Sequence, residues 1–282
     1  MIIDFHIHPA HYQIRTAAWE KLLREVWGDR LEWVVKTYSS PTAFLGLMDE
    51  AGIDYAVILA ELAPITTGIA DNEYVAEFCS QSERLIPFAS INPFTCKHPA
   101  QELEHLVRNY GFRGLKLYPT YQQYYPNDAR MYPLYSKAQE LGIPISLHIG
   151  SSVFAGARLK YGDPIYLDDA AVDFPDLVLL QCHSGRPFWY QKAFSLAWLH
   201  KNIYMEISGL PPKKLLNYFP ELERIAHKVI YGSDWPGVST IKENIQAVRE
   251  LPISENSVRK ILGENAASLL GIAGSVETMK SG

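Results

Sequence analysis

Two histidines separated by a single residue, His6 and His8, lie near the start of the chain. They end the run MIIDFHIH, whose β-branched and aromatic residues predict a buried strand. Because side chains alternate between the two faces of a strand, we expect both histidines to share one face with Asp4. The other face is then formed by the apolar residues Ile3, Phe5 and Ile7. Two imidazoles at one strand end can bind a single metal ion, although two histidines without a shared role would show the same motif.

Further side chains able to bind a metal or to move a proton occur in or directly after apolar runs. His148, His183 and Asp234 each stand at the end of such a run, and Lys116 lies inside another. Imidazole nitrogens and carboxylate oxygens are ligands that zinc accepts, and both groups also act as general acids and bases. So many metal-competent groups at strand ends are not expected by chance.

The elements that would position these residues alternate between short apolar runs and amphipathic helical patterns. Eight runs are predicted as strands, at residues 1–8, 55–60, 85–91, 114–118, 144–148, 177–182, 203–207 and 229–232. Helices are predicted between and after them, at residues 41–51, 73–81, 99–109, 132–141, 166–174, 188–200, 215–226, 240–250 and 256–270.

This alternation favours an all-parallel α/β sheet, because parallel strands need helical crossovers and are buried on both faces. Eight such units in 282 residues favour a closed (β/α)₈ TIM barrel over an open doubly wound sheet. In such barrels the active site lies at the C-terminal ends of the strands, which is where the candidate residues fall. The long aromatic segment 9–40, which precedes the first predicted helix, is predicted to be a functional lid. Residues 1–273 are predicted to form one domain, with 274–282 as a polar tail.

Composition excludes several classes of protein. The net charge is −5 and the basic residues are dispersed, which argues against a nucleic-acid partner. The three cysteines form no CxxC pair, so neither a disulfide framework nor a structural zinc motif is predicted. No apolar run reaches the roughly 18 residues that a membrane span needs, and no secretion signal is recognisable. We therefore expect a cytoplasmic protein with no membrane association.

Several motifs together resemble the amidohydrolase superfamily. They resemble in particular its branch of small metal-dependent hydrolases and decarboxylases related to aminocarboxymuconate-semialdehyde decarboxylase. The matching motifs are HIH at 6–8, GLKLYP at 114–119, LH at 147–148, HSG at 183–185, GSDWP at 232–236 and ILGENA at 261–266. The resemblance therefore spans nearly the whole chain, but it does not fix the substrate.

The resemblance implies one divalent metal ion, with zinc preferred and Mn²⁺ or Fe²⁺ as alternatives. Its ligands would be His6, His8, His148 and Asp234, with water in the remaining position. Asp234 would be a ligand, the base that takes a proton from the water, or both. His183 matches the family's histidine that contacts this water or polarises the substrate. Each of these residues could instead be a buried polar residue with a supporting role.

Lys116 has three possible roles. Since Leu115 and Leu117 should face the helices, Lys116 should point into the barrel together with Tyr118. A buried lysine is costly unless it is paired, and pairing with an acid such as Glu206 is the preferred interpretation. The alternatives are a substrate-binding lysine and, as in other branches of the superfamily, a carboxylated lysine that bridges two metal ions.

The predicted substrate-binding residues are Lys116, Tyr118, Arg186 and Trp235. Arg186 can bind a carboxylate through two parallel hydrogen bonds, although a surface salt bridge would explain it equally well. The aromatic segments 12–33 and 121–125 could cover a small, partly aromatic substrate or form the interface of a homodimer. We expect a small-molecule substrate and a homodimer.

Three functions are compatible with this sequence. The first, which we prefer, is a metal-dependent hydrolase of a small carboxylate-bearing molecule. The second is a non-oxidative decarboxylase of an aromatic or unsaturated acid that uses the same metal site. The third is a barrel that binds metal without catalysis, which the complete set of ligands disfavours. Fold alone does not separate hydrolase from decarboxylase.

Overall fold

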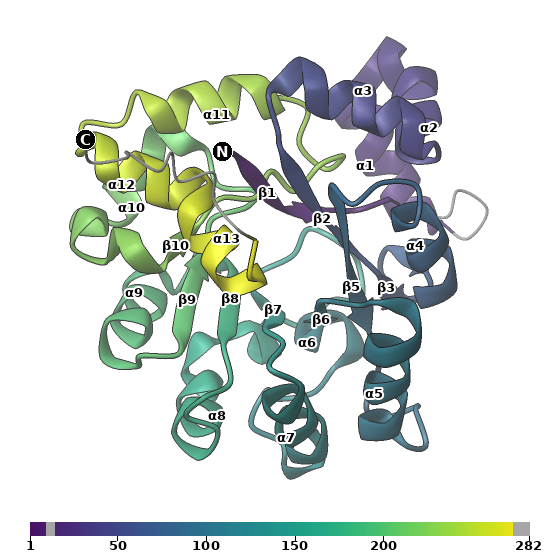
Figure 1. Ribbon diagram of the computed structural model, residues 1–282, viewed down its shortest axis with the longest axis vertical. Coiled ribbons are helices and arrows are strands. Elements are labelled where there is room, and N and C mark those ends of the chain that lie inside the picture. Colours follow the sequence, from purple (N-terminus) through teal and green to yellow (C-terminus); the bar gives the residue numbers. More distant parts are fainter. Residues whose placement is uncertain (10–14, 273–282) are drawn as a thin grey trace, which may run out of the picture.

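The computed structural model describes residues 1–9 and 15–272. Eight parallel strands form one sheet in the order β1-β2-β5-β6-β7-β8-β9-β10 (Figure 1). Their bounds are Ile3–Ile7 (β1), Tyr55–Leu59 (β2), Leu85–Ser90 (β5), Gly114–Leu117 (β6), Ile145–Gly150 (β7), Leu179–Arg186 (β8), Ile203–Glu206 (β9) and Val229–Ile230 (β10). The N–H of Phe5 donates to the carbonyl of Tyr231, and the N–H of Asp234 donates to the carbonyl of His6. These bonds join the first strand to the last, which confirms the predicted (β/α)₈ barrel. The predicted tail lies outside the described residues.

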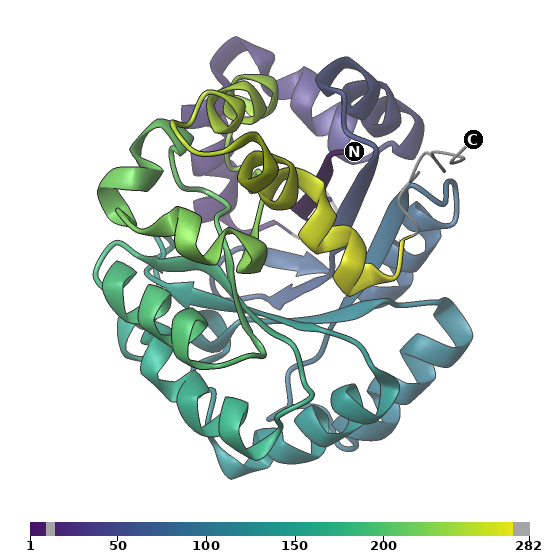
Figure 2. The same cartoon turned by 60° about the vertical axis from the view of Figure 1, so that its left-hand side comes forward.

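Helices surround the strands in both views (Figures 1 and 2). Their bounds are Ala17–Trp27 (α1), Leu31–Tyr38 (α2), Pro41–Ala51 (α3), Asn72–Cys79 (α4), Pro99–Tyr110 (α5), Pro119–Gln122 (α6), Tyr132–Leu141 (α7), Leu167–Asp173 (α8), Tyr190–Leu199 (α9), Leu215–Tyr218 (α10), Ile241–Arg249 (α11), Glu255–Arg259 (α12) and Asn265–Leu270 (α13). Each helix predicted between strands is present, but 215–226 is divided near Pro220 because proline cannot donate a helical hydrogen bond. Within the described part of the chain, no helix is long and apolar enough to cross a bilayer.

Two apolar layers hold the barrel together. The outer layer packs one face of the strands against the helices. The inner layer fills the barrel with side chains of the opposite face, including Val57, Phe88 and Ile230, and it packs against α13. Gly114 leaves room for this inner layer, since a Cβ there would lie 2.3 Å from the Phe88 ring. Because α13 covers the end of the barrel at which the strands begin, the opposite end is left for a site.

Strand β1 departs from simple alternation. Its pairing with β2 shifts by one residue between Asp4 and Ile7, which is the mark of a β-bulge. Ile3 and Phe5 consequently pack in the inner layer, whereas Ile7 packs in the outer layer. The prediction that these three residues share one face is therefore wrong: one extra residue in a strand reverses the side to which all later side chains point.

Segment 9–40 is largely helical in its described part, although no helix was predicted before residue 41. Trp19, Leu23 and Trp27 are buried on α1 at intervals of four residues, which is the spacing of one helix face. The Thr16 side chain caps this helix by accepting from the Trp19 N–H. The Trp27 indole donates to the carbonyl of Pro236 at 2.8 Å and ties α1 to the loop after β10. A short hairpin, β3 (Glu61–Ala63) and β4 (Gly68–Ala70), was also not predicted.

Candidate active site

Three candidate metal ligands meet at the mouth of the barrel, where β1 and β10 end. His6 Nε2 and His8 Nε2 lie 3.1 Å apart. Each of these nitrogens lies 3.5 Å from Asp234 Oδ1. Asp234 is held in place by its neighbour, because the N–H of Ser233 donates to the buried carboxylate of Asp4 at 2.8 Å. The predicted convergence of these three side chains is therefore present.

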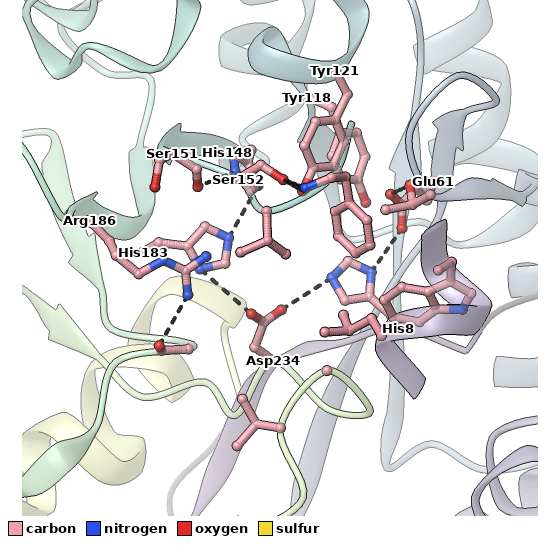
Figure 3. A pocket seen from close by; sticks show the side chains of 18 of the residues that line it. His8, Glu61, Tyr118, Tyr121, His148, Ser151, Ser152, His183, Arg186 and Asp234 are labelled. Atoms are coloured by element: carbon pink, nitrogen blue, oxygen red, sulfur yellow. Dashed lines mark hydrogen bonds and ion pairs between the residues drawn. The ribbon is translucent and has the colours of Figure 1, made fainter. Parts of the chain in front are cut away.

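The outer nitrogens of both histidines face carboxylates. His6 Nδ1 lies 2.9 Å from Glu206 Oε2. His8 Nδ1 lies 3.3 Å from Glu61 Oε2 (Figure 3). A carboxylate accepts hydrogen bonds, so it favours a proton on Nδ1 and leaves a lone pair on Nε2. Two nitrogen lone pairs and one carboxylate oxygen then point at the same small volume. Such an arrangement is repulsive unless a cation or an additional proton lies between them, and a divalent metal ion fits it.

The protonation of this group follows from the same geometry. Burial alone would raise the pKa of Asp234, but its contacts with His8 and the charges of His6, His8 and Arg186 lower it to about 2. Burial would lower the pKa of His8, but its interactions with Asp234 and Glu61 raise it to about 9. His8 therefore carries the additional proton when no metal is bound, and a metal ion would displace that proton.

His183 and His148 form a second pair on the other side of the mouth. His183 Nδ1 lies 3.0 Å from the carbonyl oxygen of Ser208, so it is the protonated nitrogen. His183 Nε2 lies 3.2 Å from His148 Nδ1, and His148 Nε2 lies 3.3 Å from the carbonyl of Ser151. A neutral His148 has only one N–H, so it can donate either to His183 Nε2 or to the Ser151 carbonyl. Its other nitrogen then carries a lone pair that can bind a metal ion.

His183 also lies close to the first group. Its Nδ1 is 3.9 Å from Asp234 Oδ2, and single ligand atoms of His6, His183 and Asp234 all lie within 4.8 Å of one another. Burial, together with the positive charge of Arg186, holds the pKa of His183 well below its usual value, so the imidazole is neutral at physiological pH. Both His183 and Asp234 have positive φ, at 64° and 68°. Such backbone strain in residues other than glycine is concentrated at functional sites.

A cavity of about 490 Å³ opens above these residues (Figure 3). Besides its histidines, four aromatic rings form part of its wall: Tyr118 and Tyr121 stack at an interplanar angle of 13°, Phe154 packs edge-on against Tyr121, and Trp19 lies next to Phe154. Arg186 enters from β8 and donates to the carbonyl of Gly209 at 3.1 Å. The cavity thus combines flat apolar walls with one guanidinium group, which suits a small anion with a planar body.

Two of the predicted substrate-binding residues do not line this cavity. The Trp235 ring is buried against Trp27, Tyr38 and Phe44, so it anchors the loop after β10 to the helices and does not face the substrate. Lys116 points into the barrel and is fully buried below the cavity. Its Nζ has no hydrogen-bond partner among the described residues, so the predicted pairing with Glu206 is limited to the charge of Lys116, which acts to lower the pKa of that carboxyl. Arg186 and Tyr118 do line the cavity.

Three residues that complete the site were not predicted from the sequence. Glu61 orients His8, and Ser208 contacts both His6 Nδ1 and His183 Nδ1 at 3.0 Å. Glu61 and Ser208 each stand just after the end of a barrel strand. Functional residues of such barrels stand at strand ends, so this position could have identified them. The hydroxyl of Tyr121 is the third, although the segment that contains it was expected to cover a substrate. Of the aromatic segment 12–33, Trp19 reaches the cavity, whereas Tyr12 lies outside the described residues.

Gly209 offers a direct test of this geometry. A Cβ at Gly209 would lie 2.4 Å from Arg186 Nη1 and 2.7 Å from Asp234 Oδ2, at a φ of +65°. We expect Gly209→Ala to displace both side chains and to lower kcat/KM by roughly 10- to 100-fold without unfolding the protein. The control is Gly46→Ala on α3, where a Cβ meets no atom within 4 Å. Equal kcat/KM values in the two variants would show that the close approach of Arg186 and Asp234 to Gly209 has no role in catalysis.

Comparisons with known proteins agree with this architecture. The sequence model of a family described as Amidohydrolase matches residues 3–272. No curated protein matches the chain. Among solved structures, an uncharacterised TIM-barrel protein from Bordetella bronchiseptica is 25% identical with a TM-score of 0.78, covering 96% of this chain and 98% of that one.

Two further structures share the fold at lower identity. A dihydroxybenzoic acid decarboxylase from Polaromonas, solved with bound manganese and an inhibitor, is 19% identical with a TM-score of 0.73 and 96% of each chain covered. A probable 2-pyrone-4,6-dicarboxylic acid hydrolase from Acinetobacter baumannii is 20% identical with a TM-score of 0.66, covering 96% of this chain and 99% of that one. Chains with this fold therefore include both a decarboxylase and a protein described as a hydrolase.

Proposed function

The chain belongs to the amidohydrolase family, and on that premise we propose that it is a metal-dependent hydrolase of a small carboxylate-bearing molecule. One observation carries this proposal: the Nε2 atoms of His6 and His8 each lie 3.5 Å from Asp234 Oδ1, directly below the cavity. The second oxygen of Asp234 remains available on the side of His183. A carboxylate placed in this way can bind a cation and accept a proton at the same site.

We propose His6, His8, His148 and Asp234 as the residues that hold one divalent metal ion. Two to three nitrogens and one oxygen, with space left for water, are the donor set of catalytic zinc sites, and Mn²⁺ also accepts such ligands. When bound there, the metal supplies Lewis acidity that lowers the pKa of water to about 7. Zinc is our preference. Manganese is the alternative, since it is bound in the Polaromonas decarboxylase.

The remaining chemistry would be done by side chains that face the cavity. Contacts with His8 and nearby positive charges keep the carboxylate of Asp234 ionised at neutral pH, so it can accept a proton from a water whose own pKa the metal would lower. His183 is neutral and adjacent, and it can pass a proton toward the leaving group. Arg186 would bind the substrate's carboxylate and so fix its orientation in the cavity.

A second candidate is the non-oxidative decarboxylation of an aromatic carboxylic acid. It is favoured by the flat cavity walls, where Tyr118 and Tyr121 stack with ring centroids 5.6 Å apart. The several decarboxylases of aromatic acids that share this fold support it as well. This reaction would need an acid that delivers a proton to carbon. In hydrolysis the proton that Asp234 takes from water can be passed on to the leaving group, whereas decarboxylation would need an acid that already holds a proton for carbon, which is why we place hydrolysis first.

Product analysis separates the two reactions. We expect the purified, metal-loaded protein to hydrolyse at least one member of a panel of lactones, amides and esters of small carboxylic acids. In isotopically labelled water, hydrolysis would place one labelled oxygen in the product, and no carbon dioxide would be released. Release of carbon dioxide from carboxylated phenols, together with no reaction of the panel, would favour decarboxylation instead.

The metal content of the protein is a separate prediction. We expect about one equivalent of divalent metal per chain, preferably zinc, because His6, His8 and Asp234 converge on a single point. The measurement is elemental analysis of the purified protein and of protein reconstituted at neutral pH. If neither sample retains a transition metal, the proposed metal site is wrong. Two equivalents would instead favour the bridging, carboxylated form of Lys116.

A further inference from the structure

Tyr121 and Ser152 bring two hydroxyl groups to the cavity wall next to the histidines (Figure 3). Tyr121 comes from α6, the short helix after β6, and its ring centroid lies 4.7 Å from that of His148. Ser152 belongs to the loop that follows β7. The Tyr121 side chain is almost fully buried, with 7% of its surface exposed, so its hydroxyl faces the site and not bulk solvent.

The hydrogen bonds around this hydroxyl leave its proton free. The backbone N–H of Phe154 donates to Ser152 Oγ at 3.2 Å, and Ser152 Oγ in turn donates to the Tyr121 hydroxyl oxygen at 3.0 Å. Tyr121 is therefore the acceptor in this bond. Among the described residues, no acceptor takes its own O–H. A buried donor without a partner costs free energy, and here its open side is the cavity.

The neighbouring tyrosine does not offer the same group. Tyr118 stacks on Tyr121, but its hydroxyl donates to the carbonyl oxygen of Ala60 at 2.9 Å. Its polar group is therefore already used inside the protein. Of the two tyrosines in the cavity wall, Tyr121 alone has an O–H left for a ligand.

Tyr121 also keeps its proton under ordinary conditions. A tyrosine hydroxyl in water loses its proton only near pH 10, well above the neutral range. The group is therefore a neutral hydrogen-bond donor next to the proposed metal ligands. A neutral donor in a site that excludes water is the kind of group that stabilises a developing oxyanion.

We propose that Tyr121 donates a hydrogen bond to the oxygen of the substrate's reacting carbonyl and so acts as a further catalytic residue. This inference rests on the proposed hydrolase function. As water adds to the carbonyl carbon, the carbonyl π electrons move to the oxygen, and the Tyr121 O–H stabilises the negative charge that forms there. The proton stays on Tyr121 throughout, and Ser152 keeps the hydroxyl in position.

The test compares Tyr121→Phe with a matched control, Tyr124→Phe. Tyr124 lies in the same segment, its hydroxyl has no partner among the described residues, and it does not line the cavity. For Tyr121→Phe we expect kcat to fall by roughly 10²–10³-fold, as for the loss of one oxyanion donor. KM should change less than about threefold, because the bond forms mainly in the transition state. Metal content and melting temperature should match those of the wild type, and Tyr124→Phe should keep the wild-type kcat.

A Tyr121→Phe enzyme whose kcat lies within threefold of the wild type would overturn the inference. So would a variant that raises KM while kcat stays the same. If Tyr121→Phe does not fold, the proposal is tested with Ser152→Ala instead. We expect the kcat of this variant to be about tenfold lower than that of the wild type, and an unchanged kcat would count against the proposal. A wild-type enzyme that hydrolyses no member of the panel would refute the proposed function itself, so the two failures are distinguishable.

Discussion

Replacing Asp234 by asparagine is expected to lower kcat by roughly 10²–10⁴-fold while leaving much of the metal in place. The reason is the dual position of this carboxylate, with one oxygen 3.5 Å from His6 Nε2 and His8 Nε2 and the other on the side of His183. An amide still offers a neutral oxygen as a ligand, but it cannot take a proton at neutral pH. Metal content and kcat should be measured together on the same preparations. A suitable control is Asp176→Asn, since Asp176 is exposed and far from the mouth.

Replacing His183 by asparagine separates acid–base catalysis from metal binding. His183→Asn should retain the metal and also lose roughly 10²–10⁴-fold in kcat, because a positioned acid–base group is lost. Asp234 has a pKa of about 2 and is ionised throughout the neutral range. The pKa of His183 lies well below its usual value, so this side chain gains a proton only under acidic conditions. The kcat of the wild type should therefore decrease as the pH is lowered. One of the two variants should not show this decrease in its pH–rate profile. Normal turnover and metal binding by Asp234→Asn would show that this carboxylate is neither ligand nor base.

The second large effect concerns the two histidines of β1. His6→Ala and His8→Ala are each expected to abolish stable metal binding and activity, because each removes one of the converging nitrogen ligands. The fold should persist, since these side chains lie at the mouth, whereas the barrel is held together by the inner and outer apolar layers. Elemental analysis, activity and thermal unfolding should be measured for both variants.

A matched control is available for these histidine variants. His105 lies on the exposed face of α5, where it contacts Asn109 at 2.6 Å. His105→Ala should keep the metal content and the activity of the wild type. If both β1 variants unfold at room temperature while His105→Ala does not, the two histidines support the structure, and the assignment as metal ligands loses its main support.

The sequence by itself was sufficient to predict the barrel and most of the candidate site. Strand and helix positions follow from local periodicity, and a parallel sheet places all strand ends at one mouth. His6, His8, His183 and Asp234 could therefore be assigned to one place from their positions relative to predicted strands, and the structure brings them together. The helix α1 could have been predicted too, since Trp19, Leu23 and Trp27 recur at helical spacing.

Tertiary structure decided which of those residues face the cavity and what orients them. The bulge in β1 turns His6 inward after Phe5, and nothing in a local pattern marks where one extra residue enters a strand. Trp235 stands beside a ligand in sequence, but its ring is buried between helices that come from a distant part of the chain.

Contacts between distant strands also determine the hydrogen bonds of the site. Glu61 on His8 and Glu206 on His6 join residues 53 and 200 positions apart, and Ser208 reaches two histidines from different strands. The protonation of each histidine, and the donor left free on Tyr121, depend on which acceptor lies within about 3 Å. Such distances are set by the packing of the whole barrel, whereas periodicity reports only on neighbours along the chain.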